Sequence, residues 1–212
     1  MMRVSPESKV REFYDSTADS YAQMMDSEID LPMYSDTLSR LAERIAAIRG
    51  PVVDTSCGSG HMLFRYRDQY DPDRSLVGVD LSPRMVALAK GRLGRSANVL
   101  AGDMRDLGQV ESASSAAVVS FFALHHLDPD KILSAFQEWR RVLRPGGQLL
   151  AATWEGAGPI DYGEESDVVA LRYSEREIRD WAVAAGYVVD RCTVEPVEGM
   201  PMMAVYLEGT RE

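Results

Sequence analysis

Three aspartates follow three apolar runs in the first half of the chain, at positions where a carboxylate could bind a ligand. Asp54 follows a valine pair, Asp80 ends the run SLVGVD, and Asp103 follows the run 97–102. The carboxyl ends of parallel strands meet at one edge of an open sheet, and ligands bind at that edge. An acid there can accept an ammonium group, ribose hydroxyls or the exocyclic amine of a base, on which Met104 would pack. The three positions therefore predict a ligand with a cationic amine, a ribose and an adenine.

The segment after Asp54, TSCGSG, consists of small residues and predicts a sharp turn close to a ligand. A dinucleotide-binding turn needs a third glycine three residues after Gly60, but that position is Leu63. The sequence has no GK[ST] pair of a phosphate-binding P-loop, and Asp54 would repel a pyrophosphate. The sequence of the turn therefore disfavours a nicotinamide-dependent dehydrogenase.

Alternating apolar runs and helical patterns must position these residues. Five apolar runs are typical of buried parallel strands, and two later runs joined without a helix predict an antiparallel hairpin: 51–54, 75–80, 97–102, 117–122 and 148–154, then 187–194 and 202–207. Ser82-Pro83 and Asp128-Pro129 each predict an N-cap followed by proline, residues 174–177 predict a capping box, and residues 144–147 predict a turn.

This alternation predicts an α/β fold with a doubly wound, seven-stranded, mostly parallel sheet and an antiparallel terminal strand. No linker or repeat divides the sequence, so residues 1–212 are expected to form one domain. Residues 1–33 form a helical extension in front of the first strand.

Several short motifs occur along the chain in a recognisable order: FYD at 13–15, the turn at 54–60, VDLS at 79–82, GDM at 102–104, FFALHHL at 121–127 and LRPGG at 143–147. With these motifs the chain resembles class I S-adenosylmethionine-dependent methyltransferases, especially the small-molecule enzymes of ubiquinone and menaquinone biosynthesis. The resemblance implies a Rossmann-like methyltransferase fold that uses S-adenosyl-L-methionine and releases S-adenosyl-L-homocysteine. It also implies methyl transfer to an oxygen or nitrogen of a small-molecule acceptor. Ser56 departs from the family, which has the first glycine of the turn there, and Ser115-Ala116 replaces a Phe-Asp pair.

The resemblance implies a role for each of these motif residues. The cofactor-binding positions would be Tyr14 and Tyr21 in a lid formed by residues 1–33; Asp54, Ser56, Gly58 and Gly60 at the methionine end; Asp80 and Leu81 at the ribose; Asp103 and Met104 at the adenine; and Phe121 under the methionine. Tyr34 would flank the same lid. The alternative for the three tyrosines is ordinary packing.

Methyl transfer depends mostly on alignment, and a general base matters only where the acceptor must lose a proton. His125 and His126 follow the fourth predicted strand and are the candidate catalytic residues. The alternative is that this pair fixes its loop by hydrogen bonds to the backbone. His61 opens a predicted helix, where an imidazolium is disfavoured, so it is the weaker candidate.

Other residues have two interpretations. Six methionines flank the predicted ligand edge and are either core filler or a substrate surface: Met24, Met25, Met33, Met200, Met202 and Met203. The segment 155–172 carries Asp161, Glu164, Glu165 and Asp167 and is either a solvated loop or a pocket wall. A wall of acids would favour a neutral or cationic acceptor over a carboxylate or phosphate. Cys57 is expected to be a packing residue, and no residue set has the spacing of metal ligands.

Composition limits the partners. The chain has 23 Lys+Arg and 33 Asp+Glu, a net charge of −10, which disfavours binding to a nucleic acid. No apolar stretch approaches the ~20 residues of a membrane span, no signal peptide is recognised, and two cysteines fit a reducing cytoplasm. A monomer or homodimer acting on a small molecule is expected. The alternative outside the enzymes is a non-catalytic S-adenosylmethionine-binding partner or regulatory subunit.

Overall fold

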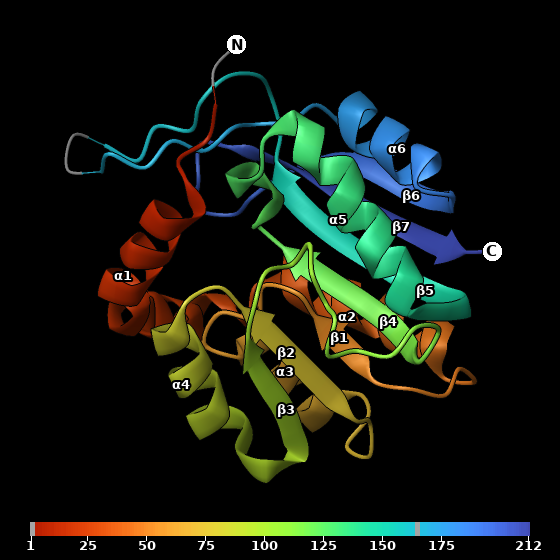
Figure 1. The fold of residues 1–212 in the computed structure, drawn as a ribbon. Coiled ribbons are helices and arrows are strands. Elements are labelled where there is room, and N and C mark those ends of the chain that lie inside the picture. The colour runs from red at the N-terminus through yellow and green to blue at the C-terminus, as the bar shows by residue number, and fades with distance from the viewer. Residues whose placement is uncertain (1–2, 164–165) are drawn as a thin grey trace.

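The computed structural model describes residues 3–163 and 166–212, and its strands form one sheet (Figure 1). The strands are β1 (Val52–Asp54), β2 (Leu76–Asp80), β3 (Ala97–Ala101), β4 (Ser115–Phe121), β5 (Leu143–Trp154), β6 (Tyr187–Pro196) and β7 (Met203–Arg211). Their spatial order is β3-β2-β1-β4-β5-β7-β6; β7 runs antiparallel to both β5 and β6, and the other neighbouring pairs are parallel. The predicted seven-stranded sheet with an antiparallel terminal strand is confirmed.

The sheet order reverses at β1. The chain adds β2 and β3 on one side of β1 and then returns to place β4 and β5 on the other. At such a reversal the connections leave the two central strands in opposite directions, which opens a crevice at their carboxyl ends. The end of β1, where Asp54 lies, is therefore next to the natural ligand position of this fold.

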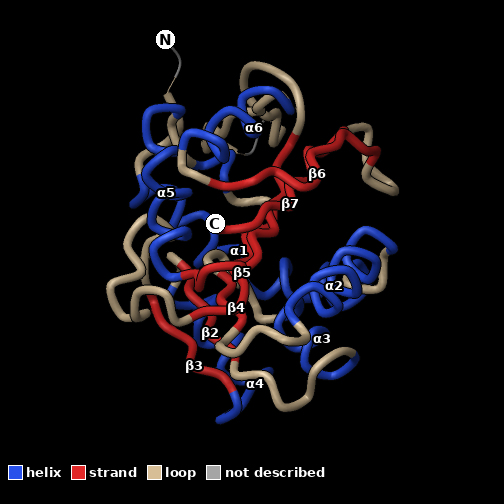
Figure 2. Tube along the Cα trace, turned by 90° about the vertical axis from the view of Figure 1, so that its right-hand side faces the viewer, coloured by secondary structure: helices blue, strands red, loops and turns tan. Residues whose placement is uncertain are grey.

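Helices cover both faces of the sheet. They are α1 (Glu7–Glu28), α2 (Pro32–Ile45), α3 (His61–Gln69), α4 (Pro83–Leu93), α5 (Pro129–Val142) and α6 (Glu175–Ala184), with the 3₁₀ turns η1 (Gly94–Ser96) and η2 (Leu124–His126). Figure 2 shows α2 and α3 on one side of the sheet and α5 on the other. One core cluster joins the sheet to α2, α3 and α4, and a second joins it to α5 and α6. No helix among the described residues is long and apolar enough to cross a membrane.

The helix starts follow the sequence signals with one exception. The Ser82 hydroxyl accepts a hydrogen bond from the Met85 amide at 3.1 Å, and Ser174 and Glu177 form the predicted capping box. Asp128 occupies the predicted N-cap position of α5 with Pro129 after it, but its side chain does not make the capping bond that such a residue usually forms. Asp128 instead accepts a hydrogen bond from the Val4 amide at 2.9 Å. Proline at the first helical position already fixes the start of α5, so the carboxylate is free to anchor the N-terminal segment.

The turn predicted at residues 144–147 is also wrong. The strand β5 begins directly after α5, because Leu143 pairs with Ser115 before the pairing resumes at Ala117 and Gln148. The residues between these pairs form an irregularity within the strand, where Gly146 has a φ of +77°. Proline and glycine therefore distort the ladder here without ending it, as in a β-bulge.

Helix α1 crosses the carboxyl edge of the sheet and lies beside α4 (Figure 1). Its acidic residues contact α4: Asp15 accepts hydrogen bonds from the Ser82 hydroxyl and the Arg84 amide, and Asp19 forms a bidentate pair with the Arg84 guanidinium at 2.9 Å. The pair is exposed and contributes little free energy alone. The contact at the amino end of α4 also satisfies a backbone amide and complements the helix dipole.

Gly50, just before β1, offers a test of how tightly the sheet edge is built. Its φ is +120°, and a Cβ there would lie 2.1 Å from the Ser114 carbonyl oxygen. Gly50→Ala is expected to lower the free energy of unfolding by more than ~3 kcal/mol, measured by urea denaturation. Gly94→Ala is the control, since Gly94 has a φ of +61° but open space around it, and should cost ~1–2 kcal/mol. Equal losses would show that backbone strain, and not the steric clash, dominates at Gly50.

Candidate active site

A cavity of about 720 Å³ lies between the carboxyl ends of the strands and helix α1. All the residues predicted for the site line this cavity except Asp54 and Gly60. The strand ends and their loops contribute Ser56, Gly58, Asp80, Leu81, Asp103, Met104, Phe121, His125 and His126, and α1 contributes Tyr14 and Tyr21. The fold thus brings together residues that are far apart in the sequence.

The turn after β1 has glycines with two different environments. Gly58 has a φ of +49°, and a Cβ there would lie 3.2 Å from the Tyr21 ring, so the tyrosine lies directly against the backbone of the turn. Gly60 has a φ of +84° and faces α4, where an added Cβ would lie 3.2 Å from Ala89. Gly60 therefore permits close packing of the turn on a helix and does not reach the cavity.

Asp80 bridges the glycine turn and α4. Its two carboxylate oxygens accept hydrogen bonds from the Ser82 amide at 2.9 Å and the Gly58 amide at 2.8 Å. Burial raises the pKa of Asp80 to about 6, although these amide hydrogen bonds favour the charged form. The carboxylate is therefore held rigidly at the cavity wall and has no cationic partner among the residues that contact it.

Asp54 lies behind the cavity wall. It is 3% exposed and accepts a hydrogen bond from the Ser56 amide at 3.1 Å. Burial, and to a smaller extent the nearby charge of Asp80, raises its pKa to about 7 against the opposing effect of the Ser56 hydrogen bond. Two acids at adjacent strand ends thus carry a large desolvation cost that a cationic ligand would reduce.

Asp103 has a different environment because Arg105 wraps around it. The Arg105 amide and Nε donate to its Oδ1 at 2.8 and 2.9 Å, and Glu7 from α1 pairs with the same guanidinium at 3.0 Å. Burial opposes the charged form, but the hydrogen bonds and charge of Arg105 hold the pKa of Asp103 below its usual range. Arg105 also lines the cavity, and the sequence reasoning missed it.

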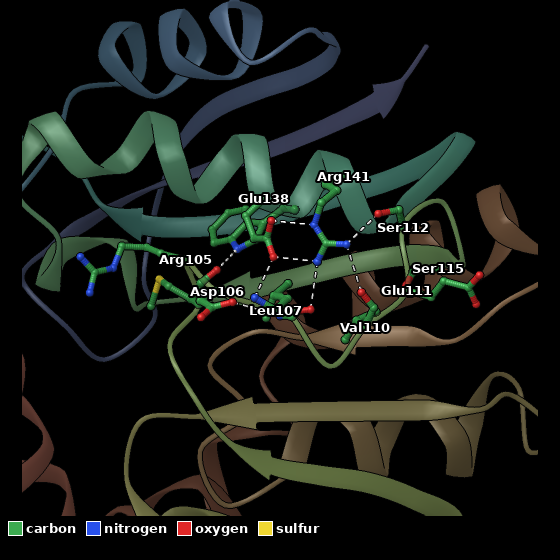
Figure 3. A network of polar contacts seen from close by, with 12 residues as sticks. Arg105, Asp106, Leu107, Val110, Glu111, Ser112, Ser115, Glu138 and Arg141 are labelled. Atoms are coloured by element: carbon green, nitrogen blue, oxygen red, sulfur yellow. Dashed lines mark hydrogen bonds and ion pairs between the residues drawn. The ribbon is translucent and has the colours of Figure 1, made fainter.

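The loop that carries Asp103 and Met104 is fixed by helix α5 (Figure 3). The Trp139 indole donates to the Met104 carbonyl at 2.8 Å, and Glu138 accepts a hydrogen bond from the Leu107 amide at 2.8 Å. Arg141 pairs with Glu138 and donates to backbone carbonyls further along the loop. These bonds satisfy loop backbone groups that would otherwise be unpaired, so the loop is held in one position at the cavity edge.

The histidine pair lies after β4 with both rings at the cavity. His126 Nε2 and the Tyr14 hydroxyl are 2.8 Å apart, and burial lowers the pKa of His126 to about 4. Burial lowers the pKa of His125 well below its usual value as well. Both imidazoles are therefore neutral near pH 7. In the described residues neither ring hydrogen-bonds to the backbone, so the prediction that the pair fixes its loop in that way is wrong.

Several cavity residues were not predicted as site residues, although Phe122 belongs to the motif at 121–127. Phe122, Trp154 and Tyr162 complete the wall next to the histidines, and the Tyr162 ring lies nearly parallel to that of His126. Phe122 has a φ of +50°, a strained backbone conformation that turns its ring toward Trp154, with ring centroids 4.5 Å apart. A loop aromatic residue is recognisable as a wall residue only once the fold places it.

The remaining sequence candidates divide between the cavity and the scaffold. Met24, Met25, Met33 and Met200 line the cavity, whereas Met202 and Met203 do not. Tyr34 lines it too. From segment 155–172 only Tyr162 is part of the wall, and Glu164 and Glu165 lie outside the described residues. Cys57 is buried, and its sulfur lies 2.9 Å from where a Cβ of Gly78 would be, in accordance with a packing role.

His61 connects the turn to α1. Its Nδ1 lies 2.8 Å from the Ser59 hydroxyl and its Nε2 lies 2.7 Å from the Asp26 carboxylate. Arg92 of α4 donates to the same carboxylate at 2.9 Å. His61 does not line the main cavity, so its role in the structure is to join helix α1 to the turn after β1. No group of three or more potential metal ligands occurs among the described residues.

Comparisons with known proteins found similarity to methyltransferases. Residues 52–147 match a family model described as a methyltransferase domain. A malonyl-[acyl-carrier protein] O-methyltransferase from Hahella chejuensis is 31% identical over 147 residues, covering 69% of this chain and 50% of that protein. A demethylmenaquinone methyltransferase from Lactococcus lactis is 27% identical, covering 68% of this chain and 58% of that protein. The chain thus spans about half the length of these curated relatives.

A solved structure shows the same fold over the whole chain. It is the Burkholderia thailandensis 1,6-didemethyltoxoflavin-N1-methyltransferase with bound 1,6-didemethyltoxoflavin and S-adenosylhomocysteine. The TM-score is 0.76 at 16% identity, covering 100% of this chain and 92% of that one. The Rossmann-like methyltransferase fold implied by the sequence motifs is confirmed.

The desolvation of Asp54 predicts a pH-dependent stability. The pKa of Asp54 is about 7 in the folded protein, above the ordinary value of 3.8. At low pH the carboxyl group is protonated in both the folded and the unfolded state. As pH rises toward 7 the unfolded state loses this proton more readily than the folded state, so the burial of Asp54 destabilises the fold. Asp54→Asn keeps an acceptor for the Ser56 amide. It should leave stability unchanged near pH 4 and raise it by on the order of 3 kcal/mol at pH 8, measured by urea denaturation of the ligand-free protein.

The matched control is Asp106→Asn, because Asp106 is exposed and also accepts a hydrogen bond from an amide two residues later. This variant should show no gain at pH 8. A loss of stability in Asp54→Asn at pH 8 would contradict the assignment of a desolvated carboxylate.

Proposed function

The chain carries a domain of the class I S-adenosylmethionine-dependent methyltransferase family, and from this we propose that it transfers a methyl group from S-adenosylmethionine to an oxygen or nitrogen of a small-molecule acceptor. The observation that carries the proposal is the position of Asp80 and Asp103. They lie at the ends of adjacent strands and face one cavity beside the Gly58 turn. Ribose hydroxyls and an adenine amine are hydrogen-bond donors that suit acceptors at these two places.

The residues present fit this cofactor. S-adenosylmethionine supplies a methyl group on a positively charged sulfur together with an ammonium group, and Asp54 and Asp80 give the cavity floor a negative potential without a cationic partner nearby. The cavity of about 720 Å³ is within the range of small-molecule sites and leaves room for a second molecule. A pyrophosphate-containing ligand would instead face repulsion from both carboxylates.

Each wall residue has a proposed part in binding. Asp80 with Leu81 holds the ribose, and Met104 packs on the adenine while Asp103 accepts its amine. Ser56 and the backbone of Gly58 hold the methionine end, with Asp54 acting from behind the wall through its charge. Phe121 lies beneath the methionine, and Tyr21 covers it from above. Gly60, which faces α4, takes part only by packing the turn.

We also propose that α1 and the residues around it, part of the segment 1–33, act as a lid of a single domain. Exposed ion pairs such as Asp19–Arg84 and the buried side chains of Val10, Ala18 and Met25 hold this helix to the rest of the chain, so opening breaks weak polar contacts and exposes a small apolar face. Closure would exclude water and align the acceptor with the methyl group. The acidic net charge of −10 supports a small-molecule acceptor and not a nucleic acid, and we propose a monomer or homodimer.

The proton of a hydroxyl acceptor has a candidate destination in His126. Its pKa of about 4 keeps the ring neutral, and Tyr14 fixes its orientation through the 2.8 Å contact. His126 Nδ1 is buried with no partner among the described residues. An unpaired buried nitrogen costs about 1–3 kcal/mol, which a hydrogen-bonding acceptor would relieve. His125, only 2% exposed, is proposed to hold the position of its neighbour.

Calorimetry and a labelled-donor assay test the proposed function. S-adenosylmethionine and S-adenosylhomocysteine should bind, NAD should not, and Asp80→Asn should weaken binding of the sulfur compounds by at least ~10-fold through loss of the ribose contact. A metabolite extract incubated with labelled donor should yield a methylated small molecule. Absence of binding would contradict the proposal. Binding without turnover on any acceptor would favour a non-catalytic cofactor-binding subunit.

The His126→Gln variant separates proton transfer from alignment. If His126 takes the acceptor proton, kcat should fall by ~10²-fold with little change in the Kd of S-adenosylmethionine. Tyr14→Phe should lower kcat less, because the ring remains and only its orienting contact is lost. Tyr70→Phe is the control, since its hydroxyl bonds to Ser35 outside the cavity. An unchanged kcat in His126→Gln would remove the histidine from the chemistry and leave the methyltransferase proposal intact.

A further inference from the structure

The two parts of the cavity wall differ in chemistry. One part comes from the ends of α1 and β5, the start of α2, the residue after β4 and the loop between β6 and β7, and it is aromatic and sulfur-rich: Met24, Met25, Met33, Tyr34, Phe122, Trp154, Val197 and Met200. Within it the Phe122 and Trp154 rings pack against each other, and Tyr34 packs on Phe121 with ring centroids 5.9 Å apart. Flat rings and polarisable thioethers form favourable contacts with aromatic ligands.

The cationic side chains that line the cavity among the described residues belong to the other part of the wall, and each of them is paired. Arg105 is held by Asp103 and Glu7, and Arg3 and Lys131 both face Asp128, at 3.8 and 3.5 Å. These residues come from the N-terminal segment, the loop after β3 and the start of α5. The aromatic part of the wall contains no arginine or lysine among the described residues. A carboxylate or phosphate on the acceptor would therefore have no cation to receive it.

Among the described residues, the aromatic part of the wall has one acid, Glu28, which is the last residue of α1. Burial raises its pKa, and its charge in turn raises the pKa values of Tyr21 and Tyr34, so the carboxylate lies near both phenols. No described residue donates a hydrogen bond to the Glu28 carboxylate or forms an ion pair with it. Most other acidic residues of α1 that contact the rest of the chain are paired. An unpaired, partly desolvated carboxylate in a cavity attracts a hydrogen-bond donor, most strongly a cation.

We propose that the acceptor is a compact aromatic or heteroaromatic molecule that carries an amine and no carboxylate or phosphate, with its ring against Phe122 and Trp154 and its amine at Glu28. This inference rests on the proposed function, because it assigns the part of the cavity that the cofactor does not fill. Ring burial supplies affinity, and Glu28 supplies selectivity for charge. Binding of an acidic analogue is disfavoured for two reasons: Glu28 repels its negative charge, and the aromatic part of the wall has, among its described residues, no cation to pair with it.

Three phenols of matched shape test the charge preference: tyramine, para-ethylphenol and para-hydroxyphenylpropionate. Their binding to the full chain is measured by calorimetry with S-adenosylhomocysteine saturating. Tyramine should bind ~10-fold more tightly than para-ethylphenol, and the carboxylate should bind at least ~10-fold more weakly, as one partly desolvated charge contact predicts. Equal or tighter binding of the carboxylate would overturn the proposal.

Two variants assign the preference to its residues. Glu28→Gln should bring the tyramine to para-ethylphenol ratio close to one, whereas Glu12→Gln, an exposed glutamate of the same helix outside the cavity, should preserve it. Trp154→Ala should weaken all three phenols by ~5-fold or more and leave S-adenosylhomocysteine binding unchanged.

An unchanged ratio in Glu28→Gln contradicts the amine contact, and binding of S-adenosylhomocysteine with none of the three phenols contradicts the aromatic acceptor. In both cases the methyltransferase proposal survives. Failure of S-adenosylhomocysteine itself to bind overturns the proposed function, and the acceptor assignment falls with it.

Discussion

The structure depends on two carboxylates buried at adjacent strand ends without a cation to pair with them. Asp54 and Asp80 are stabilised by backbone amides of Ser56, Gly58 and Ser82, and their pKa values still rise to about 7 and 6. Amide hydrogen bonds lower the cost of burying a charge but do not cancel it. The desolvation of these two carboxylates therefore destabilises the ligand-free protein, and a positively charged ligand reduces that free-energy cost when it binds.

This arrangement explains why the turn after β1 is built from small residues. The Gly58 amide must point at Asp80 while Tyr21 lies against the same backbone, and a side chain at Gly58 would come within 3.2 Å of the ring. Gly60 meets a separate need, since it lets the turn pack on Ala89. The motif thus combines ligand approach on one side with helix packing on the other, and the sequence alone does not show which glycine serves which purpose.

Local signals predicted the sheet and many of the residues that line the cavity, because strand ends, caps and the acids are encoded by residues close in the chain. The errors came where tertiary contacts decide the outcome. The Asp128 side chain accepts a hydrogen bond from the Val4 amide and makes no capping bond to α5. Residues 144–147 stay in a strand because the neighbouring strand pairs on both sides of them. Arg105, Tyr162 and Trp154 were missed for the same reason: their positions in the wall depend on the packing of distant elements.

Polar contacts join helix α1, which covers the cavity, to α4 and to the turn after β1. Asp26 of α1 pairs with Arg92 of α4 and with His61, whose ring also contacts Ser59 in the turn. A ligand that shifts the turn therefore acts on α1 through His61, in addition to any direct contact with Tyr21 of that helix. Because the contact uses a half-exposed carboxylate and one buried imidazole, it can break at modest cost. Cofactor binding at the turn and closure of α1 over the acceptor are thus expected to be energetically coupled, since each fixes one end of this network.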